Sequence, residues 1–311
     1  RRSPTIATLQ TRARRTGATW RLLSRSSCKG GLQMKLIDIS RISVLSLHYN
    51  NYTLDYFLDC QAKLGIKNVE LLSAHQGLWM DEYGYQDPAP IRRKLEDRGL
   101  SCPVFTPENC AYGYQFAAKE PEAIDRTFRY FSNGIRFGAE LGAKILEANS
   151  GWGYWNEDKQ EAWKRSAAML HRLAEVAKEN GITLVMESIR PEESQLVINL
   201  EAAQKMLKEV NHPNLKGMVD TCAMGVAGET LEDWFQALGS DIRHMHFIDG
   251  TPYGHLVWGD GNHHLGRFIE VLNRYGYEGY LGQEITDGRY YMDPAAADLR
   301  NMKNFERYIE D

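Results

Sequence analysis

The distribution of apolar residues predicts short strands that alternate with helices along most of the chain. From residue 53 onward, a stretch with helical periodicity is repeatedly followed by a glycine and then by a short apolar run. A glycine directly after a helix adopts the left-handed conformation that other residues resist, so it marks the point where a helix ends and a strand begins. This pattern predicts five strands, within residues 64–72, 98–105, 141–148, 180–187 and 275–284.

Three further apolar runs, at residues 43–47, 215–220 and 243–249, raise the number of predicted strands to eight. The run ITLVM is continuously apolar and rich in β-branched residues, which is typical of a parallel strand covered on both faces. The segments between the strands have helical period: Ile124, Phe128, Phe131 and Ile135 form one apolar stripe.

Eight alternating strand–helix units predict an α/β protein with a (β/α)8 TIM-barrel fold. A doubly wound sheet that binds a dinucleotide would need a glycine-rich turn after the first strand. The corresponding turn here is HYNNYT (48–53), which contains no glycine. We therefore expect a closed barrel without a dinucleotide site.

Charge divides the chain into two parts. Residues 1–33 contain eight basic residues and no acidic one, which leaves 29 basic and 41 acidic residues, a net charge of −12, in residues 34–311. We expect 1–33 to be a basic leader outside the fold, of transit-peptide, vector or translated upstream origin, and 34–311 to be a single barrel domain. An acidic domain repels phosphate backbones, which argues against nucleic-acid binding.

Composition also indicates the cellular compartment in which we expect the protein. No run of eighteen apolar residues is present, so we expect no membrane span. The five cysteines are odd in number and show no C-x-x-C spacing. We interpret them as reduced thiols of a cytoplasmic protein.

Four of the predicted strands end on residues that can bind a metal ion: Glu187, Asp220, His246 and Glu284. In a TIM barrel all strands end at the same rim, where reactive groups gather. A single strand-end carboxylate more often caps a helix or faces solvent, but several like charges at one rim repel each other unless a cation neutralises them. Three carboxylates and one imidazole suit a divalent ion, with Mn²⁺ expected first and Co²⁺, Mg²⁺ or Zn²⁺ as alternatives.

These four residues, spaced by 33, 26 and 38 positions, resemble the metal quartet of the xylose isomerase-like sugar epimerases and isomerases, in particular the ketose 3-epimerases. The likeness to the fructoselysine 3-epimerases covers most of residues 40–310. It rests on four segments: TPENCAYGY (106–114), MESIRPEESQLV (186–197), MVDTCA (218–223) and residues 243–284. The resemblance implies that Glu193, six residues after Glu187, contacts the substrate, and Glu108 lies in a shared segment and is a candidate for lining the pocket.

Two positions depart from the ketose epimerases. Ala223 stands where the family has a substrate-binding histidine, and Pro252 stands where it has an arginine. We expect His255 to substitute in part. Because polar contacts for a small ketose are missing, the substrate is not expected to be a plain ketohexose.

The rim segments are rich in aromatic residues, which suit the C–H faces of sugars and also aryl groups, although about half are expected only to seal the barrel mouth. We expect Trp152 to contact substrate, and we expect a glycoside or a sugar with a bulky appendage as the small-molecule partner. The aromatic residues are Trp79, Tyr83, Tyr112, Tyr114, Trp152, Tyr154 and Trp155.

The resemblance implies proton transfer next to a sugar carbonyl through an enediolate, with Glu187 and Glu284 as the catalytic pair. The alternative within this chemistry is the large subunit of a C-glycoside deglycosidase, which acts on 3-oxo-glycosides by β-elimination and pairs with a small second subunit. An endonuclease-IV-like enzyme, which needs more histidines and a basic groove, and a non-catalytic sugar binder are remote alternatives. By family analogy we expect a homo-oligomer.

Overall fold

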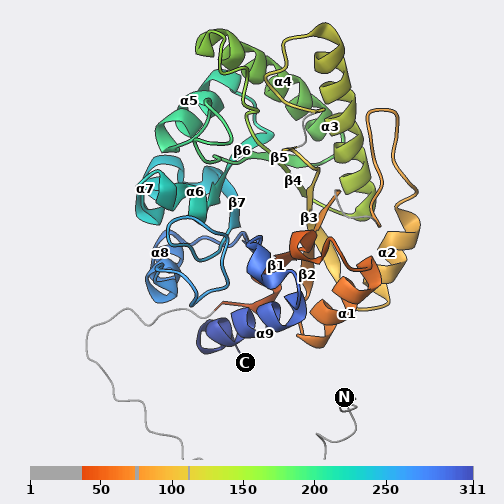
Figure 1. Ribbon diagram of the computed structural model, residues 1–311, viewed down its shortest axis with the longest axis vertical. Coiled ribbons are helices and arrows are strands. Elements are labelled where there is room, and N and C mark those ends of the chain that lie inside the picture. Colours follow the sequence, from red (N-terminus) through yellow and green to blue (C-terminus); the bar gives the residue numbers. More distant parts are fainter. Residues whose placement is uncertain (1–36, 74–76, 111–112, 311) are drawn as a thin grey trace, which may run out of the picture. The chain divides into compact units, whose positions relative to one another are not determined.

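The computed structural model describes residues 37–73, 77–110 and 113–310. The basic segment 1–33, which we expect to lie outside the fold, is not among the described residues, and neither is the rim residue Tyr112. The remaining chain is drawn as a ribbon in Figure 1.

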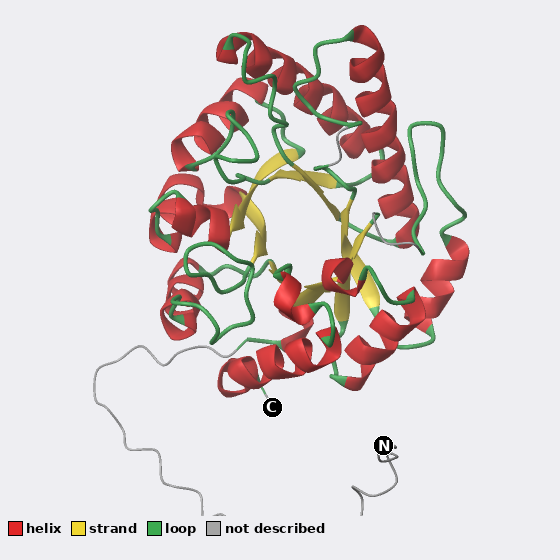
Figure 2. Ribbon diagram, in the orientation of Figure 1, coloured by secondary structure: helices red, strands yellow, loops and turns green. Residues whose placement is uncertain are grey.

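Eight parallel strands close into one barrel, each paired with its neighbours in sequence and the last paired with the first. Figure 2 shows the strands as an inner ring surrounded by helices. The predicted (β/α)8 TIM barrel is therefore confirmed, and all eight predicted strands are present. Their bounds are β1 Ile42–Leu45, β2 Asn68–Leu72, β3 Ser101–Thr106, β4 Ile145–Ala148, β5 Thr183–Met186, β6 Leu215–Asp220, β7 Ile242–His246 and β8 Tyr280–Gln283.

Helices connect the strands and cover the outside of the barrel (Figure 1). The predicted apolar stripe of 124–135 lies on the long helix α3, where Phe131 and Ile135 are buried. The helix bounds are α1 Leu54–Lys63, α2 Ala89–Glu96, α3 Pro121–Leu141, α4 Lys159–Glu179, α5 Leu200–Val210, α6 Thr221–Val226, α7 Leu231–Leu238, α8 Leu265–Tyr275 and α9 Pro294–Phe305.

The glycines that predicted the helix ends adopt the expected backbone conformation. All five have a positive φ, between 61° and 101°. At the end of α3, for example, Gly142 has φ 101° and its N–H donates to the carbonyl of Ala139. The helix–glycine–strand pattern therefore located real helix ends in this chain.

The inside of the barrel has an apolar layer and a polar layer. Val104, Ile145, Val185 and Met218 form a buried cluster on four consecutive strands. Side chains two positions apart on a strand point to the same face, so the residues two positions later also point into the barrel, nearer its carboxyl end. These residues are Thr106, Glu147, Glu187 and Asp220, so the polar layer stands on an apolar floor.

The described helices include none that is long and apolar enough to cross a membrane. Cys60, Cys102, Cys110 and Cys222 are all free, which agrees with the expectation of reduced thiols at the described positions.

Candidate metal and active site at the carboxyl end of the barrel

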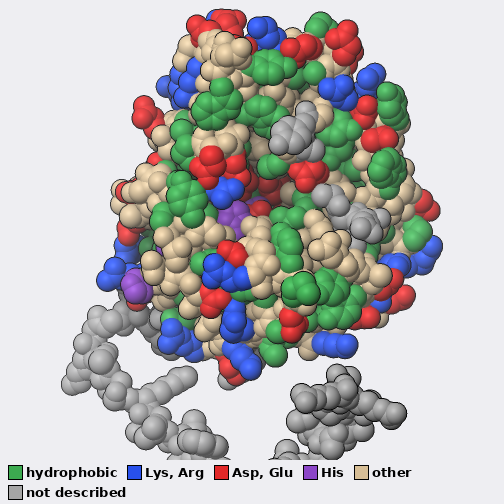
Figure 3. Space-filling model, in the orientation of Figure 1, with side chains coloured by type: hydrophobic (Ala, Val, Ile, Leu, Met, Phe, Trp, Pro, Cys, Tyr) green, Lys and Arg blue, Asp and Glu red, His purple; other side chains and the backbone are tan. Residues whose placement is uncertain are grey.

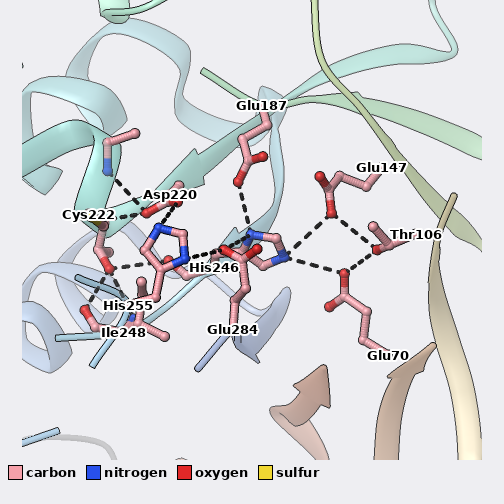
Figure 4. Close-up of polar contacts among 12 residues, drawn as sticks. Glu70, Thr106, Glu147, Glu187, Asp220, Cys222, His246, Ile248, His255 and Glu284 are labelled. Atoms are coloured by element: carbon pink, nitrogen blue, oxygen red, sulfur yellow. Dashed lines mark hydrogen bonds and ion pairs between the residues drawn. The ribbon is translucent and has the colours of Figure 1, made fainter. Parts of the chain in front are cut away.

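The four predicted ligands converge at the carboxyl end of the barrel. Glu187 directly follows β5, Asp220 and His246 are the last residues of β6 and β7, and Glu284 directly follows β8. One potential ligand atom from each lies within 4.8 Å of the others. Figure 4 shows these side chains pointing toward one another, and Figure 3 shows a hollow on this face with acidic and histidine side chains at its base.

The contacts around His246 suit a positively charged ion. Its Nδ1 atom lies 2.9 Å from Glu187 Oε1 and also 2.9 Å from Glu284 Oε2. Only the Glu187 contact has hydrogen-bond geometry, and the buried Glu284 Oε2 has no hydrogen-bond partner among the described residues. Buried polar atoms without partners are costly, whereas lone pairs that converge on one point are the arrangement that a cation needs. The residues present therefore fit one divalent metal ion.

Asp220 is oriented by the helix that follows it. Its Oδ1 accepts hydrogen bonds from the backbone N–H groups of Cys222 (2.5 Å) and Ala223 (3.2 Å), so Asp220 is the N-cap of α6. These hydrogen bonds hold the carboxylate in one orientation, because one of its oxygens accepts from backbone N–H groups that have no partner within the helix. The other oxygen, Oδ2, remains available toward the cluster.

His255 joins the cluster from the loop after β7. Its Nε2 lies 3.3 Å from Asp220 Oδ2, and its Nδ1 lies 3.1 Å from Glu284 Oε2. Neither nitrogen makes a hydrogen bond to a described residue, although both are buried. His255 therefore faces two of the predicted ligands, and its substrate role stays a prediction.

A second polar cluster lies on the other side of the His246 ring. The Nε2 atom of His246 is 3.4 Å from Glu70 Oε1 and 3.5 Å from Glu147 Oε2. Glu70 is also 3.0 Å from His244 Nε2 and accepts from the Thr106 hydroxyl at 2.6 Å. A metal-bound histidine usually gives its second N–H to a carboxylate, which fixes the ring orientation and the tautomer. Glu70 stands in that position.

The packing of this second cluster depends on the absence of a side chain at Gly282 on β8. A Cβ atom there would lie 2.8 Å from the backbone oxygen of Met245 and 3.1 Å from both Glu70 Oε2 and His244 Nε2. Glycine therefore leaves the space in which the Glu70–His244 pair sits.

The carboxylates of the site differ in their affinity for protons. Burial, together with the nearby charge of Glu147, raises the pKa of Glu187 well above the usual value of a glutamate. Burial also raises the pKa of Glu284, but the positive charges of His246 and His255 outweigh it and leave that pKa below the usual value. Burial and the charges of Glu70 and Glu284, partly offset by His246, raise the pKa of Glu147 to about 7. The surroundings of these three carboxyl groups therefore shift their pKa values in different directions.

The other predicted substrate residues occupy different positions. The Glu193 carboxylate forms an ion pair with Arg190, with contacts of 2.9 Å to Nε and 2.5 Å to Nη2. The Glu108 carboxylate accepts from the backbone N–H of Cys110 at 2.7 Å, so it stabilises its own loop. Trp152 lines a cavity beside the site together with Glu193. The substrate roles of Glu108, Glu193 and Trp152 stay predictions.

The two departures from the ketose epimerases supply no polar side chain. The Ala223 side chain is a methyl group, and the backbone N–H of this residue donates a hydrogen bond to Asp220 Oδ1. Pro252 accepts a contact from the Cys222 thiol at 3.3 Å through its carbonyl oxygen. Contacts to a substrate at these positions must therefore come from other residues.

Glu70 and Glu147 were not singled out by the strand-end pattern that predicted the four ligands. Both lie fully inside the barrel beside His246. The signal was the pair His244–His246: residues two apart on a strand point to the same face, so a second imidazole had to lie one layer below the first. No comparable pattern in the sequence indicated that Arg190 would form an ion pair with Glu193.

Comparison with known proteins identifies the family and agrees with the fold. The sequence profile of the xylose isomerase-like TIM barrel matches residues 59–305. Fructoselysine 3-epimerase of Shigella flexneri is 28% identical over 209 residues, which is 67% of this chain and 75% of that protein. Among solved structures, D-psicose 3-epimerase from Clostridium cellulolyticum H10 superposes with a TM-score of 0.72 at 16% identity, covering 87% of this chain and 100% of the other. A 3-keto-D-glucoside 4-epimerase from E. coli gives the same TM-score at 15% identity, covering 86% and 99%.

Proposed function

The chain belongs to the xylose isomerase-like TIM-barrel family, and from that premise we propose that it is a divalent-metal-dependent sugar epimerase or isomerase. The observation that carries the proposal is the position of His246 Nδ1, 2.9 Å from a carboxylate oxygen of Glu187 and 2.9 Å from one of Glu284. Two carboxylates from separate strands thus converge with an imidazole nitrogen at the barrel mouth, which is the kind of donor set that binds a divalent ion.

Glu187, Asp220, His246 and Glu284 would hold the ion, for which the oxygen-rich donor set favours Mn²⁺. When bound, a divalent ion supplies electrostatic stabilisation of the negative charge that develops on the sugar oxygens as the neighbouring C–H bond breaks. His255 would contact the substrate from the side of Asp220 and Glu284.

Glu187 and Glu284 are the proposed catalytic pair. One carboxylate takes the proton from the carbon next to the carbonyl, and the other, protonated at the start, returns a proton to the opposite face, which inverts that carbon. Such a transfer requires one member of the pair to be protonated and the other ionised when the substrate binds. We assign the reaction to the keto-sugar 3-epimerase type, in the cytoplasm.

The test is proton exchange. Purified protein loaded with Mn²⁺ is incubated with D-psicose and with fructoselysine in D2O, and deuterium incorporation at the epimerised carbon is followed by NMR. We expect exchange and epimer formation with at least one sugar, and loss of both in Glu187→Gln and Glu284→Gln. Sugar binding without deuterium incorporation would indicate a non-catalytic binder and would refute the proposal.

The deglycosidase alternative is tested in the same experiment with a 3-oxo-C-glycoside. Release of free aglycone, without epimerisation of any ketose, would assign the barrel to that reaction instead.

A further inference from the structure

A second group of metal-binding side chains lies next to the four predicted ligands and shares Asp220 with them. Asp220, Cys222 and His255 each offer one ligand atom, and these three atoms lie within 4.8 Å of one another (Figure 4). Cys222 is fully buried, and the side chain of His255 is 11% exposed. We call this group the thiol site.

The start of α6 fixes the first two members of the thiol site. The backbone N–H of Cys222 donates to Asp220 Oδ1 at 2.5 Å, so the helix cap sets the spacing between the two residues. Because Oδ1 is occupied in this way, Oδ2 is the oxygen that remains for a cation. The Cys222 thiol donates to the carbonyl oxygen of Pro252 at 3.3 Å. Thiols are weak donors, so a metal–sulfur bond can replace this contact at little cost.

The backbone holds His255 in place. The loop after β7 folds back on itself, with the Leu256 N–H donating to the Asp249 carbonyl at 2.9 Å and the Asp249 N–H donating to the Leu256 carbonyl at 3.1 Å. The carbonyl of His255 accepts from the N–H of Thr286, in the segment after β8, at 3.2 Å. The position of the imidazole therefore does not depend on hydrogen bonds of its ring.

Both ring nitrogens of His255 are buried and make no hydrogen bond to a described residue. Nε2 lies 3.3 Å from Asp220 Oδ2, and Nδ1 lies 3.1 Å from Glu284 Oε2. With its proton on Nδ1, the imidazole directs that proton toward Glu284 and the lone pair of Nε2 toward Asp220. A carboxylate behind the second nitrogen is the usual arrangement of a metal-bound histidine. The Nε2 lone pair is therefore placed to bind a cation together with Asp220.

The chemistry of the thiol site differs from that of the four predicted ligands. Three carboxylates and an imidazole suit Mn²⁺, whereas a thiolate, an imidazole and one carboxylate oxygen suit a softer ion such as Zn²⁺. Zinc is typically tetrahedral in proteins, and three protein ligands leave its fourth position to water or substrate. A thiol that binds zinc is deprotonated, and its proton passes to solvent.

We propose that Asp220, Cys222 and His255 bind a zinc ion, and that this ion inhibits the enzyme. The zinc ion takes the free oxygen of Asp220, which the proposed catalytic ion also uses, and it occupies His255, which then no longer contacts substrate. The inhibitory part rests on the proposed function. The binding part does not, because it requires only the three side chains of the thiol site.

Cobalt tests the binding part, because Co²⁺ occupies zinc sites and a cobalt–thiolate bond gives a charge-transfer absorption in the near ultraviolet. Mn²⁺-loaded protein is titrated with Co²⁺ and then with Zn²⁺, and the zinc dissociation constant is measured by calorimetry. We expect the absorption in the wild-type protein, its removal by Zn²⁺ and its absence in Cys222→Ser. The zinc dissociation constant should rise at least about 10-fold in Cys222→Ser, since loss of a group that only orients a ligand already costs about 10- to 100-fold.

Epimerisation at increasing Zn²⁺ concentration tests the inhibitory part. Cys222→Ser keeps the backbone N–H that orients Asp220, so we expect its activity with Mn²⁺ to match that of the wild type and its inhibition to require at least about 10-fold more Zn²⁺. The matched control is Cys110→Ser, which removes a thiol that lines the cavity beside Trp152 and does not belong to the thiol site. This control should keep both the cobalt absorption and the wild-type response to zinc.

A wild-type protein without the cobalt–thiolate absorption, or a Cys222→Ser protein that retains it, would overturn the inference. Equal inhibition of both proteins by Zn²⁺ would place the inhibitory ion at Glu187 and His246 and refute the inhibitory part, as would zinc binding without any inhibition. If the wild-type protein epimerises no sugar, the proposed function fails, and the cobalt spectrum still decides whether the thiol site binds metal.

Discussion

The Nε2 atom of His246 lies 3.4 Å from Oε1 of Glu70, on the side of the ring away from the nitrogen that faces Glu187 and Glu284. His246 thus connects two polar clusters, one open to substrate and one enclosed by the barrel. We interpret Glu70 as a positioning residue, which would act on the proposed metal ion through the histidine rather than by contact with substrate.

This relationship predicts that Glu70→Gln weakens metal binding. Loss of the orienting carboxylate behind a metal-bound histidine typically costs about 10- to 100-fold in affinity. We expect the Mn²⁺ dissociation constant, measured by calorimetry, to rise within that range while circular dichroism stays native. The control is Glu140→Gln, which changes a carboxylate that accepts from Tyr85 on the surface. An unchanged dissociation constant in Glu70→Gln would contradict the assignment.

Metal removal should lower thermal stability. The converging carboxylates repel one another without a cation, and a ligand that binds only the folded state at 100 times its dissociation constant adds about 2.7 kcal/mol. In a chain of this size we expect the melting temperature to fall by several degrees in EDTA and to recover with Mn²⁺. The double variant Glu187→Gln with His246→Asn should show no such response. If neither EDTA nor Mn²⁺ changed the melting temperature of the wild-type protein, this result would count against a metal site.

Gly282→Ala should be destabilising and should disturb the enclosed cluster. The added methyl group would lie 2.8 Å from the Met245 carbonyl oxygen, which is part of a strand and cannot easily move. Overpacking of this kind costs about 1–3 kcal/mol in the free energy of unfolding. Gly288→Ala is the matched control, since a Cβ there meets no atom within 4 Å. Urea titration of both variants measures the difference, and equal midpoints would refute the argument.

Acid should loosen the loop between β4 and α4, which contains Glu157. Although burial raises the pKa of Glu157, hydrogen bonds from Tyr154 and Arg165 outweigh it and leave that pKa below the usual 4.5. A carboxylate with a lowered native pKa contributes stability above pH 4.5, and this contribution is lost as the pH falls through the native value. Tryptophan fluorescence should therefore change below pH 4.5 in the wild-type protein. Glu157→Gln should show the altered spectrum already at neutral pH, and a spectrum like that of the wild type would contradict the role of Glu157.

The barrel and the four converging residues could be predicted because local rules fix them. A glycine after a helix and a short apolar run locate each strand, and the barrel places all strand ends at one rim. Glu187, Asp220, His246 and Glu284 follow from this topology without knowledge of any loop.

The loops could not be predicted in the same way. His255 approaches Asp220 only because the segment after β7 folds back over the rim, and the pairing of Glu193 with Arg190 depends on the turn of 190–193. Glu70 and His244 are 174 positions apart, so their contact exists only after the barrel has closed. Such contacts leave no periodic trace in the sequence.

The groups proposed to transfer protons are attached to the ends of strands, whereas the cavity beside Trp152 is lined mainly by the loops after β4 and β5. Reactivity and selectivity are therefore separable parts of this molecule. We therefore expect replacement of residues 149–158 together with 188–199 to change which substituents this cavity accepts, while the residues at the strand ends are kept.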